Sequence, residues 1–330
     1  MYNKFTADDS LEIRSHSDQS IVSFQVNTDR REAVFRALKP FQAQVGKEIE
    51  NKQVVIKVNA GMAAREYFLH STHVDQIRGI LDFLEKIYDR TVIVTEGAAG
   101  AMCSAFDGFL NYGYMQLEKE YNVKFIDAND QPYSLQSIGG SKHRPMEVNV
   151  VDMFLDPDIY MISAPRMKVH NKVVGTFSLK NVVMGAPVCH YKKKINEKQK
   201  MHGHSKESEC RELNYNIYNL AKMGVQPDLS IIDGIVAIEG NGPWGGTPVE
   251  HGVTIASTDF VAADRLCAEL MGIDPKYMKY LEWCALAGMG NFNMSDITVV
   301  GPDYLNYIHN YNLNDNFEKQ VSWIDEYDNG

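Results

Sequence analysis

The sequence predicts an α/β protein with a doubly wound, mostly parallel sheet, helices on both faces and a long basic functional loop. Continuous apolar runs, such as KQVVIKVN at 52–59 and TVIVTEG at 91–97, are typical of strands that are buried on both faces. Helical patterns separate these runs, and such alternation indicates parallel strands joined by crossover helices. With 44% hydrophobic residues among 330, the chain has enough apolar material for a large core.

The N-terminal part is expected to alternate strands with helices. Thr72 suits the N-cap of the second helix because its hydroxyl can accept a hydrogen bond from the first turn, where Asp75 adds a favourable charge. The apolar residues of that helix share one face. The strands are expected at 20–26, 52–59, 91–97 and 123–127, and the helices at 29–44, 72–88 and 104–112.

The C-terminal part continues with further strands and helices. Asp259 suits an N-cap, and Pro275 suits the first turn of the next helix. We divide the chain into an N-terminal α/β half at 1–150, a C-terminal α/β half at 151–310 that carries the basic loop, and an acidic tail at 311–330, which is expected on the surface. The strands are expected at 146–155, 159–165, 228–240, 251–258 and 296–301, and the helices at 208–222, 259–271 and 275–287.

Charge is distributed unevenly along the chain. Between Arg166 and Lys206, ten Lys and Arg residues accompany one acidic residue, Glu197, so this stretch carries +9. Because the whole chain carries −10, the remainder carries −19. A cationic segment in an anionic protein focuses the electric field where an anionic ligand arrives. Weak periodicity predicts a long functional loop with one short helix; a merely solvated basic loop is the alternative.

Composition argues against several classes of protein. The negative net charge is unfavourable for general nucleic-acid binding, and no window holds the ~20 consecutive apolar residues that span a bilayer. Residues 1–16 lack the apolar core of a secretion signal. Five scattered cysteines, none in C-x-x-C spacing, indicate reduced thiols and a cytoplasmic location. They also argue against a zinc ribbon or an iron–sulfur cluster held by this chain alone.

Polar residues stand at the ends of several predicted strands, where open parallel sheets bind their ligands. Lys57 and Asn59 end the second strand, and Glu96 and Asp127 end the third and fourth. A single charge at a strand end is usually solvated, but several in one chain favour a shared site. The same position in later strands is held by Asp233 and Asp259, with Glu239 just beyond Asp233.

The stretch Gly240–Gly246 is rich in glycine. It matches neither G-x-G-x-x-G after a first strand nor a Walker pattern, so neither familiar nucleotide site is supported. Its glycines, Gly242 among them, allow the backbone to approach a ligand closely or to turn sharply between strands. Both interpretations stay open at this stage.

The basic stretch also contains residue types that move protons. A buried lysine near other cations has a lowered pKa and can act as a base or nucleophile, so Lys168 is a candidate catalytic residue. His170 and His202 are candidates too, because imidazole transfers protons near neutral pH or binds metal. The alternative is that these side chains only neutralise a ligand. The candidate substrate-binding residues are Lys57, Asn59, Lys180, Asn181 and Gly242.

A series of motifs resembles the family called domain of unknown function 362. In order, they are VVIKVN, APRMKVH, TFSLKNVVMG, His202, PDLSIIDG, EGNGP-x-GG, D-x-x-AAD at 259–264, MGIDP and GMGN. The match spans roughly residues 50–301 and implies an α/β fold. It places Lys57, Asn59, Lys168, His170, Lys180, Asn181, His202, Asp233, Glu239, Gly242, Asp259 and Asp264 on the family pattern. Many members carry ferredoxin-like cysteine motifs, which this chain lacks.

Three functions remain open from the sequence. The first is an enzyme that acts on a small carboxylate or phosphate metabolite by Lys- and His-assisted proton transfer, as isomerases and lyases do. The second is a metal-dependent or redox enzyme in which Asp233, Glu239 and Asp264 join His170 and His202 as ligands of a divalent metal. The third is a non-catalytic binding or scaffold protein. The expected partner is a small anionic substrate, with no nucleic acid and no membrane, and a homo-oligomer is compatible with the sequence.

Overall fold

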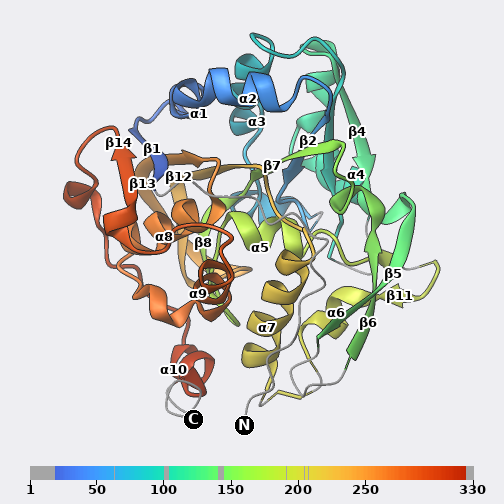
Figure 1. The fold of residues 1–330 in the computed structure, drawn as a ribbon, viewed down its shortest axis with the longest axis vertical. Helices are drawn as coiled ribbons and strands as arrows, with labels where there is room; N and C mark the ends of the chain where they lie inside the picture. Colours follow the sequence, from blue (N-terminus) through green and yellow to red (C-terminus); the bar gives the residue numbers. More distant parts are fainter. Residues whose placement is uncertain are drawn as a thin grey trace.

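One large sheet crosses the molecule and carries helices on both sides (Figure 1). The computed structural model describes residues 19–62, 64–99, 104–139, 145–190, 192–203, 205–206 and 208–324. Within these ranges ten strands form the sheet in the order β14-β1-β13-β12-β7-β2-β3-β4, while β8 pairs with β12 and β9 with β8. The strands are β1 (Ser20–Val26), β2 (Gln53–Val58), β3 (Val92–Glu96), β4 (Val123–Asp127), β7 (Ile159–Ala164), β8 (Arg166–His170), β9 (Val174–Thr176), β12 (Leu229–Asn241), β13 (Gly245–Ser257) and β14 (Ile297–Val300).

The strand directions confirm the predicted class, a mostly parallel sheet, in which β13 and β9 run antiparallel to their neighbours. Strands β12, β7, β2, β3 and β4 run parallel, as do β1 and β14. Strands β12 and β13 are antiparallel because only residues 242–244 connect them, and a connection this short reverses the chain. Strand β1 then pairs antiparallel with β13, so the sheet joins strands from both predicted halves of the chain.

Alternating side chains of the buried strands supply two cores, one on each face of the sheet. In β2, Val54 and Ile56 pack with helices α1 and α3, while Val55 faces the opposite core. This alternation is the two-residue period of a strand. One face is covered by α1 (Arg30–Leu38), α2 (Gln42–Glu48), α3 (Val74–Leu84) and α4 (Ala105–Asn111), and the other by α5 (Ser178–Val183), α7 (Glu209–Lys222), α8 (Phe260–Leu270) and α9 (Lys279–Leu286).

Two predicted helix boundaries are corrected by local chemistry. The helix expected at 29–44 is interrupted by a 3₁₀ turn at Lys39–Phe41, because Pro40 has no N–H for the helical ladder. The next helix, α3, is capped by His73, whose Nδ1 accepts from Asp75 N, and Thr72 is not its cap. The Thr72 hydroxyl instead accepts from Asn59 N and donates to Ala164 O, which ties the end of β2 to the end of β7.

The basic stretch 166–206 is not the long loop that its weak periodicity predicts. Strand β8 inserts beside β12, and β9 folds back on β8. These segments are too short to show a period, and tertiary pairing decides their conformation. After α5, the remainder consists of β10 (Cys189–His190), β11 (Ile195–Asn196) and α6 (Glu197–Met201).

Residues 133–139 and 145–151 form a separate two-stranded antiparallel sheet. Its second strand, β6 (Pro145–Val151), is shorter than the strand expected at 146–155, and its first, β5 (Tyr133–Gly139), was not predicted. The part of the tail that the structure describes lies on the surface with Asp315, Glu318 and Lys319 exposed, and it packs against the body with its other side. Gln320 is buried and accepts from Val174 N, and α10 (Phe317–Val321) contacts α7.

Residues 1–18 and 325–330 lie outside the described part of the chain, and with them the predicted absence of a secretion signal at 1–16. Across the residues that are described, no helix combines the length and the apolar character needed to cross a bilayer.

Candidate functional site

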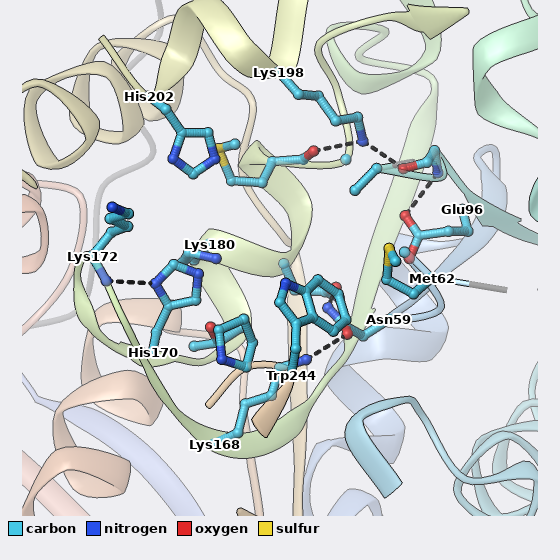
Figure 2. A pocket seen from close by; sticks show the side chains of 18 of the residues that line it. Asn59, Met62, Glu96, Lys168, His170, Lys172, Lys180, Lys198, His202 and Trp244 are labelled. Atoms are coloured by element: carbon cyan, nitrogen blue, oxygen red, sulfur yellow. Dashed lines mark hydrogen bonds between the residues drawn. The ribbon is translucent and has the colours of Figure 1, made fainter. Parts of the chain in front are cut away.

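A cavity of about 460 Å³ lies at the carboxyl ends of β2 and β3, the edge where open parallel sheets bind ligands (Figure 2). Strand β8, helices α5 and α6 and the β12–β13 turn complete its wall. Five lysines and two histidines line it, and Glu96 is the acidic residue among the lining side chains that the structure describes. These lining residues are Lys57, Lys168, Lys172, Lys180, Lys198, His170 and His202.

The floor of the cavity is a buried ion pair. Lys57 Nζ lies 2.8 Å from Glu96 Oε1 and also donates to Val58 O and to Asn181 Oδ1. Glu96 in turn accepts from the backbone N–H groups of Ala60 and Gly97. Burial lowers the pKa of Lys57, and the charge of Glu96 opposes this shift. The negative charge of Glu96 is therefore already compensated by Lys57 and by two backbone N–H groups.

Lys168 projects from β8 next to this floor. Its Nζ donates to Asn59 Oδ1 and to His70 O, each at 2.8 Å, and lies 5.7 Å from the centre of the Trp244 ring. Burial first, and then the positive charge of Lys180, hold the pKa of Lys168 well below its usual range. Lys168 has no ion pair with a carboxylate among the described residues.

Helix α5 presents Lys180 and Asn181 to the cavity. The helix begins where it does because Asp264 accepts from the backbone N–H groups of Ser178 and Leu179, which satisfies donors that a helix start leaves free. Asn181 accepts from Lys57 and Asn59 through one amide oxygen, so it ties the floor together. Burial, followed by the charges of Lys57 and Lys198, lowers the pKa of Lys180 to about 7.

Two neutral imidazoles complete the wall. His170 Nδ1 accepts from Lys172 N at 3.0 Å, so the neutral ring carries its proton on Nε2. Burial holds the pKa of His170 well below its usual range, with Lys180 the next contributor. His202 follows α6, and burial with the charge of Lys180 lowers its pKa to about 4. Near neutral pH both rings are therefore uncharged.

Sequence reasoning missed several residues of this wall. Lys198 on α6 donates to Gly97 O and to Met184 O, and burial lowers its pKa to about 8. In the sequence it is one lysine in the run EKQK, which looks like any solvated helix surface. Nothing in the sequence marks Trp244 or Thr176 as site residues either. Thr176 reaches the cavity because β9 pairs with β8, and Trp244 reaches it because it lies in the turn between β12 and β13.

The structure gives Gly242 a packing role. A Cβ atom on this residue would lie 2.3 Å from Val169 O, so the β12–β13 turn rests directly on β8. Asn314 donates to Gly242 O from the other side. Gly242 does not line the cavity, whereas its neighbours Pro243 and Trp244 do. Its lack of a side chain allows the turn to come close enough to place them there.

The three carboxylates predicted as metal ligands do not come together. Asp233 pairs with Arg30 at 2.8 Å, Glu239 accepts from the backbone and side chain of Asn312, and Asp264 accepts from α5. None of them lines the cavity. Throughout the described ranges, no three His, Cys, Asp or Glu side chains are grouped so as to hold a metal ion.

The strand-end residues divide in the same way. Lys57, Asn59 and Glu96 converge on the cavity. Asp127 instead accepts from Ser104 and Ala105 at the start of α4, and Asp259 caps α8 through Ala262 N. One strand-end carboxylate, Glu96, thus lines the cavity, whereas Asp127 and Asp259 accept hydrogen bonds at the starts of helices. Only tertiary contacts distinguish these two roles.

Comparison with known proteins places the chain in a family. It is 28% identical over 166 residues to the "Thylakoid-associated protein sll1697" of Synechocystis sp., and this alignment covers 50% of the chain and 47% of that relative. The chain thus spans about half the length of the curated relative it matches. A solved structure of the lactate racemase apoprotein from Thermoanaerobacterium thermosaccharolyticum aligns over 77% of this chain and 58% of that one, with 13% identity and a TM-score of 0.45. The family model described as "Domain of unknown function (DUF362)" matches residues 54–269. The chain belongs to the DUF362 family, as its motifs predicted.

Proposed function

We propose that this protein is an enzyme that binds a small carboxylate or phosphate metabolite in the cavity and transfers protons on it, as isomerases and lyases do. The excess of positive charge is the observation that carries the proposal. Five lysines line the cavity, and Glu96, the acidic lining residue in the described part, is already paired with Lys57. Buried cations without anionic partners are unfavourable, so an anionic ligand would stabilise them.

The interactions of each lysine suggest its role. Lys57 is held by Glu96 and Asn181 and orders the floor. Lys168 and Lys180 have no carboxylate partner within the described residues, so no protein carboxylate competes with an anionic ligand for their amino groups. Asn59 joins the floor of the cavity to the wall that carries Lys168, because it forms hydrogen bonds with both Asn181 and Lys168. An anion near these lysines would raise their pKa values, since an opposite charge favours the protonated form.

Proton transfer is assigned to Lys168, His170 and His202. As a neutral amine, Lys168 donates two N–H groups to its oxygen partners and keeps a lone pair for a substrate proton. His170 offers Nε2–H as a donor. Burial, followed by the positive charge of Lys180, lowers the pKa of both imidazoles, so an anion that offsets that charge would raise both pKa values again, in the direction useful for general acid–base catalysis.

Hydrogen–deuterium exchange tests this proposal. The protein is incubated in D₂O with pyruvate, 2-oxoglutarate, L-malate or dihydroxyacetone phosphate, and exchange at the carbon next to the carbonyl or carboxylate is followed by NMR. We expect exchange with at least one compound, reduced about 10²–10⁴-fold in Lys168→Ala and in His202→Ala. Lys192→Ala is the matched control, since Lys192 belongs to the same basic stretch but is exposed and does not line the cavity.

Binding provides the second measurement. Titration calorimetry with inorganic phosphate and with oxalate should show binding to the wild-type protein that weakens in Lys168→Ala and persists in Lys192→Ala. If neither anion binds to the wild-type protein, the cavity is not an anion site and the proposal is wrong. The proposal is also wrong if Lys168→Ala and His202→Ala bind anions and exchange protons like the wild type.

A further inference from the structure

Lys180 differs from the other lysines of the cavity in its contacts. Within the described part of the chain, its amino group has no hydrogen bond and no ion pair, although its side chain is only 8% exposed. Each other lysine of the cavity donates to at least one acceptor. The pairs are Lys57 with Glu96 and Val58 O, Lys168 with Asn59 and His70 O, Lys172 with Glu209, and Lys198 with Gly97 O and Met184 O.

The surroundings of Lys180 favour the neutral amine. The side chain is buried, and the charges of Lys57 and Lys198 act on it, so its pKa falls to about 7. A substantial fraction is therefore unprotonated at neutral pH, with a lone pair that no neighbour occupies. A desolvated lysine close to other cations is the arrangement by which proteins activate an amine as a nucleophile.

We propose that Lys180 forms a Schiff base with the carbonyl group of a small 2-oxo acid. This inference rests on the proposed function and specifies its substrate class: an anion that also carries a ketone or aldehyde. The protonated imine would act as an electron sink, which makes a proton or carboxylate on the neighbouring carbon easier to remove. That chemistry fits an isomerase or a lyase.

The covalent step needs no oxidant and no reductant. The Lys180 lone pair attacks the carbonyl carbon, the C–N bond forms, and the carbonyl π electrons move to oxygen. A proton passes from nitrogen to that oxygen, giving a carbinolamine. The nitrogen lone pair then forms the C=N bond while the hydroxyl group takes up a proton and leaves as water, so the products are one iminium ion and one water molecule.

Neighbouring groups match the needs of this step. His170 has its Nε2–H available to donate a hydrogen bond to the carbonyl oxygen and then to the departing hydroxyl. Because this ring is neutral, the proton that the hydroxyl takes up comes from water. Lys180 and His170 line the same cavity (Figure 2). Thr176 lines the same cavity, and its buried hydroxyl has no hydrogen-bond partner in the described structure. It can donate to the carboxylate of a 2-oxo acid.

Reductive trapping tests the proposal. The full chain is incubated with pyruvate, glyoxylate or 2-oxoglutarate and sodium cyanoborohydride, followed by intact mass measurement and peptide mapping. We expect one reduced adduct on Lys180, suppressed by excess sulfate, absent from Lys180→Arg and unchanged in Lys192→Arg. The arginine variant keeps the positive charge but has no nucleophilic amine. Mapping of the wild-type protein requires no variant, so it decides the result even if Lys180→Arg does not fold.

The outcomes separate this proposal from the one it rests on. If phosphate and oxalate bind but no 2-oxo acid is trapped on Lys180, or if trapping is equal on exposed lysines, Lys180 is not a Schiff-base nucleophile and the anion site stands. If the wild-type protein binds neither anion, the proposed function fails first. A mapped adduct on Lys180 that sulfate suppresses supports both.

Discussion

The ammonium group of Lys57 lies 2.8 Å from the carboxylate of Glu96, and both side chains are almost completely buried. This pair joins the carboxyl ends of β2 and β3 at the floor of the cavity. It leaves the remaining lysines of the wall without an acidic partner among the lining side chains described. Lys172 pairs with Glu209, which does not line the cavity, so Lys168, Lys180 and Lys198 are the lining lysines without a carboxylate partner among the described residues.

Replacement of Glu96 by Gln should destabilise the protein by about 3–5 kcal/mol, because it leaves a buried ammonium group uncompensated. The amide would also place a donor next to the N–H groups of Ala60 and Gly97 or next to Lys57. The free energy of unfolding, measured in urea, checks this prediction. Glu120→Gln is the matched control, since the Arg78–Glu120 pair is on the surface and should change stability by at most about 1 kcal/mol. Equal effects of the two substitutions would contradict a buried, coupled pair.

Anion affinity should fall as pH rises from about 6 to 9. The pKa values are about 7 for Lys180 and about 8 for Lys198, so both ammonium groups lose their protons across this interval. A ligand that requires one such proton binds up to about tenfold more weakly per pH unit above the pKa. Sulfate is a suitable probe because its charge is constant in this range. Titration calorimetry should show the decline in the wild type and a smaller decline in Lys180→Met, whereas a constant affinity would exclude lysine protonation as the source of binding.

Asp264→Ala should weaken anion binding although Asp264 does not line the cavity. The substitution leaves the buried N–H groups of Ser178 and Leu179 without acceptors, at a cost of about 1–3 kcal/mol each, and loosens the helix that carries Lys180. Asp29→Ala removes the N-cap of α1, which lies away from the cavity, so it should cost about 1 kcal/mol and leave sulfate affinity unchanged. If sulfate affinity is unchanged in Asp264→Ala as well, the carboxylate does not position α5.

Gly242→Ala should displace the β12–β13 turn, because the new methyl group would lie 2.3 Å from Val169 O. We expect a loss of about 1–3 kcal/mol from overpacking and a change in the fluorescence of Trp244, which is 41% exposed at the mouth of the cavity. Gly46→Ala is the control. Gly46 lies in α2, and its new methyl group would meet the Ile87 side chain at an ordinary contact distance of 3.7 Å. Wild-type stability and fluorescence in Gly242→Ala would show that the turn is not pressed against β8.

The regular elements were predictable where they are long and strongly patterned. The run KQVVIKVN identified β2 and placed Lys57 and Asn59 at its end, and Asp259 was identified as the N-cap of α8. The segments between residues 166 and 206 were not predictable, because strands and helices of two to six residues show no measurable period. The conformation of β8 depends on its pairing with β12, in which Arg166 lies opposite Asp233 from a distant part of the chain, and β9 in turn depends on β8.

Site residues followed the same division. Lys168, His170 and His202 were selected because the local excess of positive charge pointed to an anion, and all three line the cavity. The proposed metal ligands looked equally suitable in the sequence. In the structure, however, Asp233 forms an ion pair with Arg30, and Asp264 accepts from the backbone N–H of Ser178 at the start of α5. The role of each of these carboxylates is set by its donor, and Arg30 and Ser178 are remote in the sequence from Asp233 and Asp264.

The sequence by itself determined that buried parallel strands would end in polar residues and that one stretch would carry most of the unbalanced positive charge. The tertiary structure alone decided which of those charges meet, and how far burial alters their protonation. Coulomb interactions and desolvation depend on distances between atoms, and Lys57 and Asn181, which share a hydrogen bond, are 124 residues apart along the chain.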